Sequence, residues 1–175
     1  SLRGAEDGQF DNPWDGATDS SGNVYVLDKG NYRVQKFDSS GNFIAKWGSL
    51  DCSQNPTLYT FCDPAGIAVD ASNDVYVTDR ANGRIVKFSS SGIFITVWNN
   101  RYATDIAVDS NGYVFTIENN GVKKLDSNGT VVSEWGSYGC AYNGPLSNGA
   151  FCNPDGLAID SNGNVYVGDQ SNYRE

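Results

Sequence analysis

The sequence predicts an all-β fold of four-stranded antiparallel blades, the architecture of a β-propeller. Three features predict it: turn-forming clusters such as "DSSGN" and "DSNGN", short runs rich in Val, Tyr and Phe between them, and repetition of this pattern along the chain. Asp, Asn and Gly supply the positive φ angles that tight turns need. Four short strands that repeat about every 40–50 residues are typical of propeller blades.

Four repeated segments align on equivalent aspartates. The intervals between them are 51, 39 and 51 residues, so the longer period is a pair of units of 90 residues, and the aligned positions are Asp19, Asp70, Asp109 and Asp160. We therefore expect a single β-propeller region over residues 1–175. Its predicted blades cover approximately residues 10–48, 61–98 and 102–136, with an incomplete blade at 151–175.

The first repeat shows how each blade is expected to be built. Its second, third and fourth strands are predicted at residues 23–28, 33–37 and 43–47, after an inner strand like "GIAVD" of the second repeat. Successive side chains of a strand point to opposite faces, so Tyr25 faces away from Val24 and Val26. A tryptophan recurs at the end of each fourth strand, which indicates packing between neighbouring blades: Trp47, Trp98 and Trp135.

Three motifs carry a resemblance to a known family. They read "NPWDGATDSSGNVYVLDKGNYRVQKF", "DPAGIAVDASNDVYVTDRANGRIVKF" and "NPDGLAIDSNGNVYVGDQSNYR". Over nearly its whole length the chain resembles the NHL-repeat family of β-propellers, whose naming tripeptide aligns with residues 31–33, 82–84 and 172–174. The third repeat departs from the pattern: Glu118 replaces the aspartate, the loop "ENNGVKKL" is two residues shorter, and the arginine is missing.

The resemblance implies more than the blade pattern. Aspartate and arginine of each repeat would clasp the loop after the second strand, as Asp28 with Arg33 and Asp79 with Arg84. As surface ion pairs, these would contribute at most about 1 kcal/mol each. Related propellers close with six blades, so about three and a half blades suggest a fragment of a longer chain, or a ring that another chain completes.

All four cysteines lie in two long inter-blade loops. The loops read "GSLDCSQNPTLYTFCDP" and "GSYGCAYNGPLSNGAFCNP". Zinc sites favour Cys-x-x-Cys pairs or histidines, and the chain has no histidine. We therefore predict two local disulfides, Cys52–Cys62 and Cys140–Cys152, and hence an extracellular or cell-surface location. "NGT" at Asn128 is either a glycosylation acceptor or a plain hairpin turn.

The loops that vary between repeats predict the functional face. Chain direction alternates along a blade, so the loop after the second strand and the inter-blade loop share one face, which we call the upper face. Binding in propellers is concentrated in such loops. The candidate ligand contacts on this face are Trp14, Arg80, Arg101, Tyr102 and Tyr142. For Trp14, which has no counterpart in the other repeats, a packing role stays equally open.

Composition narrows the classes of function. The formal charge is −9, from 12 basic and 21 acidic residues, which opposes a nucleic-acid partner. No apolar run is long enough to span a membrane. Without histidine, an acidic metal site would need unrepeated carboxylates such as Asp105, Glu118 and Asp155. We therefore expect no metal or cofactor and no enzyme activity.

The best-supported function is then a non-catalytic binding or scaffold module. Its partner would be a protein, a peptide or a glycan bound at the variable loop face. One alternative is a structural surface or filament protein that self-associates through open blade edges. A less favoured alternative is a fragment of a propeller lyase or hydrolase, because enzymes of both kinds occur among similar propellers.

Overall fold

The computed structural model describes residues 3–99, 101–140 and 148–171. Its chain contacts divide it into two compact units, Ser1–Ala103 and Thr104–Glu175, and each unit is described by itself below. The expectation of one continuous β-propeller region therefore stays a prediction. Within the described ranges, no helix has the length and apolar character that crossing a membrane requires.

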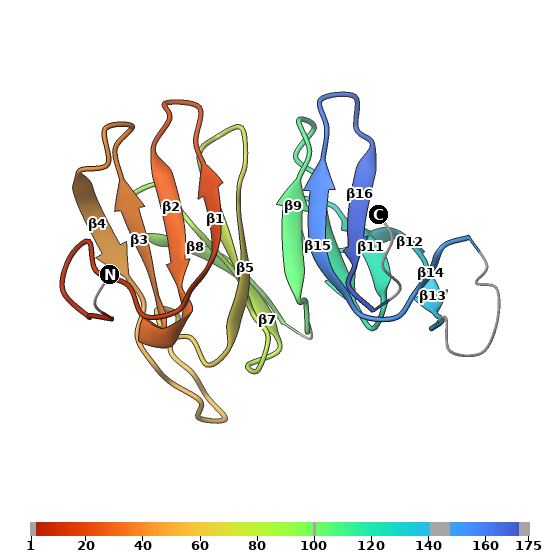
Figure 1. The fold of residues 1–175 in the computed structure, drawn as a ribbon, viewed down its shortest axis with the longest axis horizontal. Helices are drawn as coiled ribbons and strands as arrows, with labels where there is room; N and C mark the ends of the chain where they lie inside the picture. The colour runs from red at the N-terminus through yellow and green to blue at the C-terminus, as the bar shows by residue number, and fades with distance from the viewer. Residues whose placement is uncertain (1–2, 100, 141–147, 172–175) are drawn as a thin grey trace. The chain divides into compact units, whose positions relative to one another are not determined.

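Unit 1 contains two four-stranded antiparallel sheets. Blade 1 has the order β1-β2-β3-β4 and comprises β1 (Pro13–Thr18), β2 (Val24–Asp28), β3 (Arg33–Phe37) and β4 (Phe43–Trp47) (Figure 1). A single 3₁₀ turn, η1 (Lys29–Asn31), follows β2. Blade 2 has the same order in β5 (Pro64–Val69), β6 (Val75–Asp79), β7 (Arg84–Phe88) and β8 (Phe94–Asn99).

Unit 2 repeats this arrangement once in full and once in part. Blade 3 contains β9 (Asp105–Val108), β10 (Val114–Glu118), β11 (Gly121–Leu125) and β12 (Val131–Trp135). The fourth, two-stranded sheet pairs β15 (Pro154–Ile159) with β16 (Val165–Asp169). A short parallel pair, β13 (Ser137–Tyr138) and β14 (Ala150–Phe151), precedes it. The predicted all-β class and the four-stranded blades are confirmed.

The turns explain why these strands end where they do. The turns between the first and second and between the third and fourth strands of a blade form the opposite face, here called the lower face. In each of them an aspartate or serine accepts hydrogen bonds from backbone N–H groups two and four residues later, as Asp19 does from Ser21 and Asn23. The fourth turn residue has a positive φ angle, which glycine adopts without strain. These residues are Gly22, Gly41, Asn73, Gly92, Gly112, Gly129 and Gly163. The predicted turn chemistry is therefore confirmed.

The core of unit 1 continues from blade 1 into blade 2. Trp47 at the end of β4 packs on Tyr25 of its own blade and on Phe88 of β7, with ring centroids 6.2 and 6.0 Å apart. It is 9% exposed, and its six-membered ring lies against Gly92. Trp47 therefore packs between blades as expected. In unit 2, Trp135 packs edge-on against Phe115 but stays 39% exposed.

In each pair of blades, one carboxylate connects the first, innermost strand of one blade to the innermost strand of the next. The Asp15 side chain in β1 accepts the N–H of Ile67 in β5 at 2.8 Å, and that of Asp105 in β9 accepts the N–H of Leu157 in β15 at 2.7 Å. Burial raises the pKa of Asp15 more than its two backbone hydrogen bonds lower it. The expectation that Asp105 is unrepeated is wrong, because its counterpart Asp15 lies two repeats away, one full 90-residue period.

The lower-face turns predict acid sensitivity. Hydrogen bonds from Asn42, then from backbone amides, lower the pKa of Asp38, and those from Asn164 do the same for Asp160. A carboxyl group with a lowered folded-state pKa stabilises the fold above its unfolded pKa of about 3.9 and loses this contribution as the pH falls through the folded value. We expect the urea midpoint to fall between pH 5 and pH 3.

The matched control is the Asp38→Asn/Asp160→Asn double variant. Asparagine keeps an oxygen acceptor for the turn amides but does not titrate in this range. The urea midpoint of the double variant should therefore change less between pH 5 and pH 3 than that of the wild type. An equal fall in both proteins would show that these turns are not the acid-sensitive groups.

Candidate functional site

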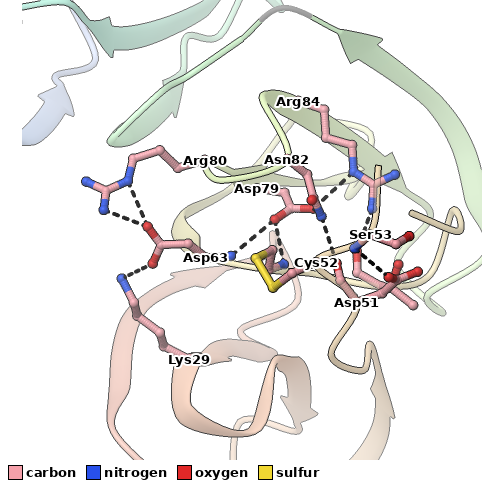
Figure 2. Close-up of a disulfide and its surroundings, with 11 residues drawn as sticks. Lys29, Asp51, Cys52, Ser53, Asp63, Asp79, Arg80, Asn82 and Arg84 are labelled. Carbon is pink, nitrogen blue, oxygen red and sulfur yellow. Dashed lines mark hydrogen bonds and ion pairs between the residues drawn. A yellow bond between two sulfur atoms is a disulfide. The ribbon is translucent and has the colours of Figure 1, made fainter. Parts of the chain in front are cut away.

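Four side chains of the upper face form a contact chain across unit 1, here called the rim cluster: Trp14, Lys29, Asp63 and Arg80. Asp63, in the loop before β5, binds Lys29 of η1 at 2.7 Å through Oδ1. Its Oδ2 binds Arg80 after β6 at 2.6 Å (Nη2) and 2.8 Å (Nε), and Figure 2 shows Asp63 between the two cations. The Lys29 ammonium group also lies 4.5 Å from the ring centroid of Trp14 in β1.

The turn after β6 brings two more candidate residues beside the cluster. The Arg101 backbone N–H donates to Gly83 O at 2.8 Å, and Gly83 N–H donates to Arg80 O. Gly83 has a φ of 62°, and a Cβ there would lie 2.7 Å from the Tyr102 ring. Glycine is therefore required for Tyr102 to pack on this turn. The two aromatic side chains are largely exposed, Trp14 by 57% and Tyr102 by 60%.

Electrostatics keep the centre of the cluster charged. Partial burial opposes ionisation of Asp63 and raises its pKa, but the hydrogen bonds and charges of Lys29 and Arg80 outweigh burial, so the pKa lies below its ordinary value. The two cations and one anion leave the rim cluster with a net positive charge in a chain whose formal charge is −9. The cluster is thus positively charged and flanked by exposed aromatic rings.

The predicted ligand contacts can now be placed. Four of them lie along this run of contacts in unit 1: Trp14, Arg80, Arg101 and Tyr102. Tyr142 lies outside the described residues. Lys29 and Asp63 were not predicted from the sequence, although Lys29 occupies the same position after its strand as Arg80 does. This shared cation could have indicated Lys29 from the sequence. The contacts of Asp63 with both cations could not be predicted, because they form only where two blades meet.

Buried aspartate–arginine pairs support this face from below. Asp28 Oδ2 accepts from Arg33 Nε at 2.8 Å, and Asp79 Oδ2 accepts from Arg84 Nε at 3.0 Å (Figure 2 shows the second pair). All four side chains are buried. The expected contribution of at most about 1 kcal/mol, which applies to surface ion pairs, is wrong because these pairs are buried. Removing one partner of a buried pair costs about 3–5 kcal/mol.

Each arginine also fixes the loop that precedes its blade. Arg33 donates to the carbonyl oxygens of Ala5, Glu6 and Gln9, and Arg84 to those of Pro56, Thr57 and Thr60. The neighbouring asparagines add one carbonyl each, Asn31 to Gly4 and Asn82 to Asp51. The pair is therefore an anchor for a loop distant in sequence, which goes beyond the local clasp that the sequence suggested.

The cysteine pairs lie in the loops that these anchors hold. The sulfur atoms are 1.99 Å apart both in Cys52–Cys62 and in Cys140–Cys152. Asp79 Oδ1 accepts the N–H of Cys62 at 2.8 Å, so the disulfide and the anchor meet at one residue. In blade 1 no cysteine is present at this point, and Asp28 accepts the N–H of Asp11 instead.

Two further sequence expectations concern glycosylation at Asn128 and a metal site. Asn128 is exposed in the turn between β11 and β12, where its N–H donates to Asp126 Oδ1, and whether it is glycosylated stays a prediction. Across the described ranges, no group of three or more His, Cys, Asp and Glu side chains is arranged to hold a metal ion.

Comparison with known proteins identifies the repeats. A model of the NHL repeat family matches residues 10–37, 61–88 and 151–175, which cover β1 to β3, β5 to β7, and β15 with β16. The chain carries NHL repeats. The third repeat, in which Glu118 replaces aspartate and the arginine is absent, lies outside the matched residues.

Two curated relatives show how far sequence similarity extends. The chain is 27% identical over 140 residues to Protein brain tumor of Drosophila melanogaster, a match that covers 76% of this chain and 13% of the relative. It is 37% identical over 90 residues to the peptidyl-glycine alpha-amidating monooxygenase of Mus musculus, covering 50% of this chain and 9% of the relative. The matched regions are therefore small parts of both relatives.

A solved structure supports the propeller fold. The streptogramin B lyase structure superposes with a TM-score of 0.63 at 21% identity and covers 88% of this chain and 47% of that one. At this level of identity the similarity speaks for the fold alone.

The buried Asp79–Arg84 pair predicts that replacing Arg84 destabilises the fold more than replacing Arg80, although both arginines pair with an aspartate. Arg84→Leu leaves the buried Asp79 without its cation and three carbonyls without a donor, so we expect a loss of about 3–5 kcal/mol in the free energy of unfolding. Arg80→Leu, the matched control, breaks a half-exposed pair and should cost no more than about 1 kcal/mol. Urea unfolding measures both. Equal losses in the free energy of unfolding would contradict the conclusion that the buried Asp79–Arg84 pair stabilises the fold more than the Asp63–Arg80 pair does.

Reduction of the disulfides should loosen the loops more than the blades. Closing a loop of 10 residues between Cys52 and Cys62 stabilises by about 2.7 kcal/mol in the chain-entropy model. With dithiothreitol, hydrogen exchange followed by mass spectrometry should speed up in residues 51–61 while β6 and β7 remain protected. A uniform gain in exchange over unit 1 would contradict this expectation.

Proposed function

We propose that this chain is an extracellular binding scaffold that recognises a protein or peptide partner through the rim cluster and the adjoining Tyr102. The carrying observation is an exposed Trp–Arg–Tyr surface, Trp14, Arg80 and Tyr102, held in place by contacts within unit 1. Trp, Tyr and Arg are the residues most enriched among those that dominate binding energy in protein interfaces.

Preorganisation supports this proposal. Arg80 is oriented by two contacts with Asp63, Trp14 lies under Lys29, and Tyr102 packs on Gly83. Side chains that are already ordered lose less conformational entropy when a partner binds, so more of the contact energy remains as affinity. The positive charge at the centre favours a partner segment with a carboxylate next to an apolar or aromatic group.

The cysteine pairs support the extracellular part of the proposal. Disulfides persist in oxidising compartments and are rare in the reducing cytosol of most organisms. The negative overall charge argues against a nucleic-acid backbone as the partner, because phosphates would be repelled at long range.

The test uses peptides selected for binding to the immobilised chain from a random-sequence display library. Affinities of the selected peptides should fall at least about tenfold in Trp14→Ala and in Tyr102→Ala, as expected for residues at the centre of an interface. Circular dichroism verifies that the variants fold. The matched control is Ile93→Ala, which removes a similarly exposed apolar side chain from a lower-face turn of the same unit.

The result can also refute the proposal. Peptides that bind the wild type and both rim variants equally would place recognition elsewhere on the chain. A library from which no peptide is enriched on the wild type would likewise argue against a peptide-binding rim.

A further inference from the structure

The outer strand of blade 2, β8, has one backbone edge with no strand beside it. Among the strands that the structure describes, β8 pairs only with β7. β4 and β12 end the sheets of blades 1 and 3 in the same way. Such an edge presents a row of backbone N–H and C=O groups on which another strand can pair. The three complete blades therefore offer three edges that a partner strand could use.

Charged side chains protect two of these three edges. Natural proteins hinder pairing at an edge by placing charges, lysine above all, on the edge strand. β4 carries Lys46 and β12 carries Glu134. β8 reads "FITVWN" and has no charged residue. The uncharged run extends over residues 89–100, which also contain no proline. Of the three outer strands, β8 alone lacks this protection.

The composition of β8 also favours pairing. Its first five residues, 94–98, are all β-branched or aromatic. Segments of this kind, with low charge and no proline, are the ones that pair with copies of themselves. The corresponding stretches are weaker strand formers, since β4 contains Ala45 and Lys46 and β12 contains Ser133 and Glu134. Charge and strand propensity thus single out the same edge.

Exposed apolar side chains surround the start of β8. Tyr59 of the disulfide loop reaches this point, where its hydroxyl oxygen accepts the N–H of Phe94 at 3.2 Å. Its ring centroid lies 6.0 Å from that of Phe88. Four large apolar residues gather around this hydrogen bond, each between 42% and 63% exposed, and are here called the β8 patch: Leu58, Tyr59, Ile93 and Ile95. Apolar surface of this kind favours association when a partner covers it.

A β-bulge leaves a regular part of this edge. The extra residue of the bulge in β8 is Ile95, and the outer strands of the other complete blades have a bulge at the same point, at Ile44 and Val132. Bulges twist an edge and hinder pairing. Since all three strands share the bulge, charge remains the difference between them. After the bulge, the register of β8 with β7 continues without interruption over residues 96–99.

We propose that two copies of this chain associate through β8, which pairs antiparallel with β8 of the second copy around a two-fold axis. This pairing joins the two four-stranded sheets of blade 2 into one continuous sheet and brings the β8 patches of both copies into the interface. In a two-fold interface the same surface of both copies meets itself, so the surface must be complementary to itself.

The charges favour a second copy as the occupant of this edge. Like charges brought together across paired strands destabilise the pair. Self-pairing of β4 would bring two copies of Lys46 into one short interface, and self-pairing of β12 would do the same with Glu134. Self-pairing of β8 brings no charge into the interface. The edge of blade 2 is therefore the one that is complementary to itself.

The overall charge sets the conditions for association. Each copy has a formal charge of −9, so two copies repel each other at low ionic strength, and salt screens this repulsion. The proposal does not rest on the rim cluster, because none of the four rim residues lies in β8 or in the β8 patch. Each proposal can therefore fail without the other.

Sedimentation equilibrium of the full chain tests the proposal. The mass should rise toward that of two chains between about 10 µM and about 1 mM, the range in which a small interface becomes populated, and should rise further at high salt. Hydrogen exchange followed by mass spectrometry gives the location. The amides of residues 96–99 should exchange more slowly at the higher protein concentration.

Two lysine variants form a matched pair. Ile95→Lys places two like charges in the interface and should weaken dimerisation at least about tenfold. Ile44→Lys makes the same substitution at the equivalent bulge in blade 1, where the side chain is 48% exposed against 45% for Ile95. It changes the net charge of the chain equally and should leave dimerisation unchanged. Circular dichroism verifies that both variants fold.

Three outcomes would overturn the proposal. The first is a chain that remains monomeric at about 1 mM and high salt, where even a weak interface is populated. The second is dimerisation that both lysine variants weaken equally, or that neither weakens. The third is slowed exchange that appears at high concentration outside β8 and the β8 patch. Exchange of the wild type decides the location even if a variant is poorly folded.

Discussion

The upper face of this protein depends on a buried carboxylate at the end of the second strand of each blade. Asp79 collects the N–H groups of Cys62 and Asp63, the amide of Asn82 and the guanidinium group of Arg84. A buried charge is tolerated only when it is paired and fully hydrogen-bonded. The groups that satisfy Asp79 come from three segments of the upper face, so satisfying one charge fixes the loop, the turn and the third strand together.

Blade 1 satisfies its carboxylate with other residues. Asp28 binds Arg33 in the same way, but no disulfide closes the preceding loop. Gln35 holds that loop instead, because its amide donates to Gln9 O and Asp28 Oδ2 and its oxygen accepts the N–H of Gly8. The equivalent residue in blade 2 is the buried Val86. A cross-link and a buried amide thus fix equivalent loops, which leaves the rim cluster on rigid supports from both blades.

Much of the fold could be read from the sequence because it is encoded locally. Turn clusters, alternating strands and the naming tripeptide lie within single repeats, and cysteine pairing needed only their spacing. The site depends on contacts between repeats. Asp63 lies between Lys29 and Arg80 only because two blades meet, and the register that places Gly121 opposite Glu118 is hidden by Lys123, whose spacing from Glu118 equals that of Arg33 from Asp28.

The carboxylates of the first strands recur once in every two blades, a period of 90 residues. Asp15 and Asp105 each bind the next innermost strand, whereas the blades that donate these bonds carry Gly66 and Gly156 at that position. A duplication or loss of a single blade would place two carboxylate-bearing or two glycine-bearing strands next to each other and would break this alternation. Gain or loss of 90 residues preserves every such pair, so lineages of this protein should change their length by two blades at a time.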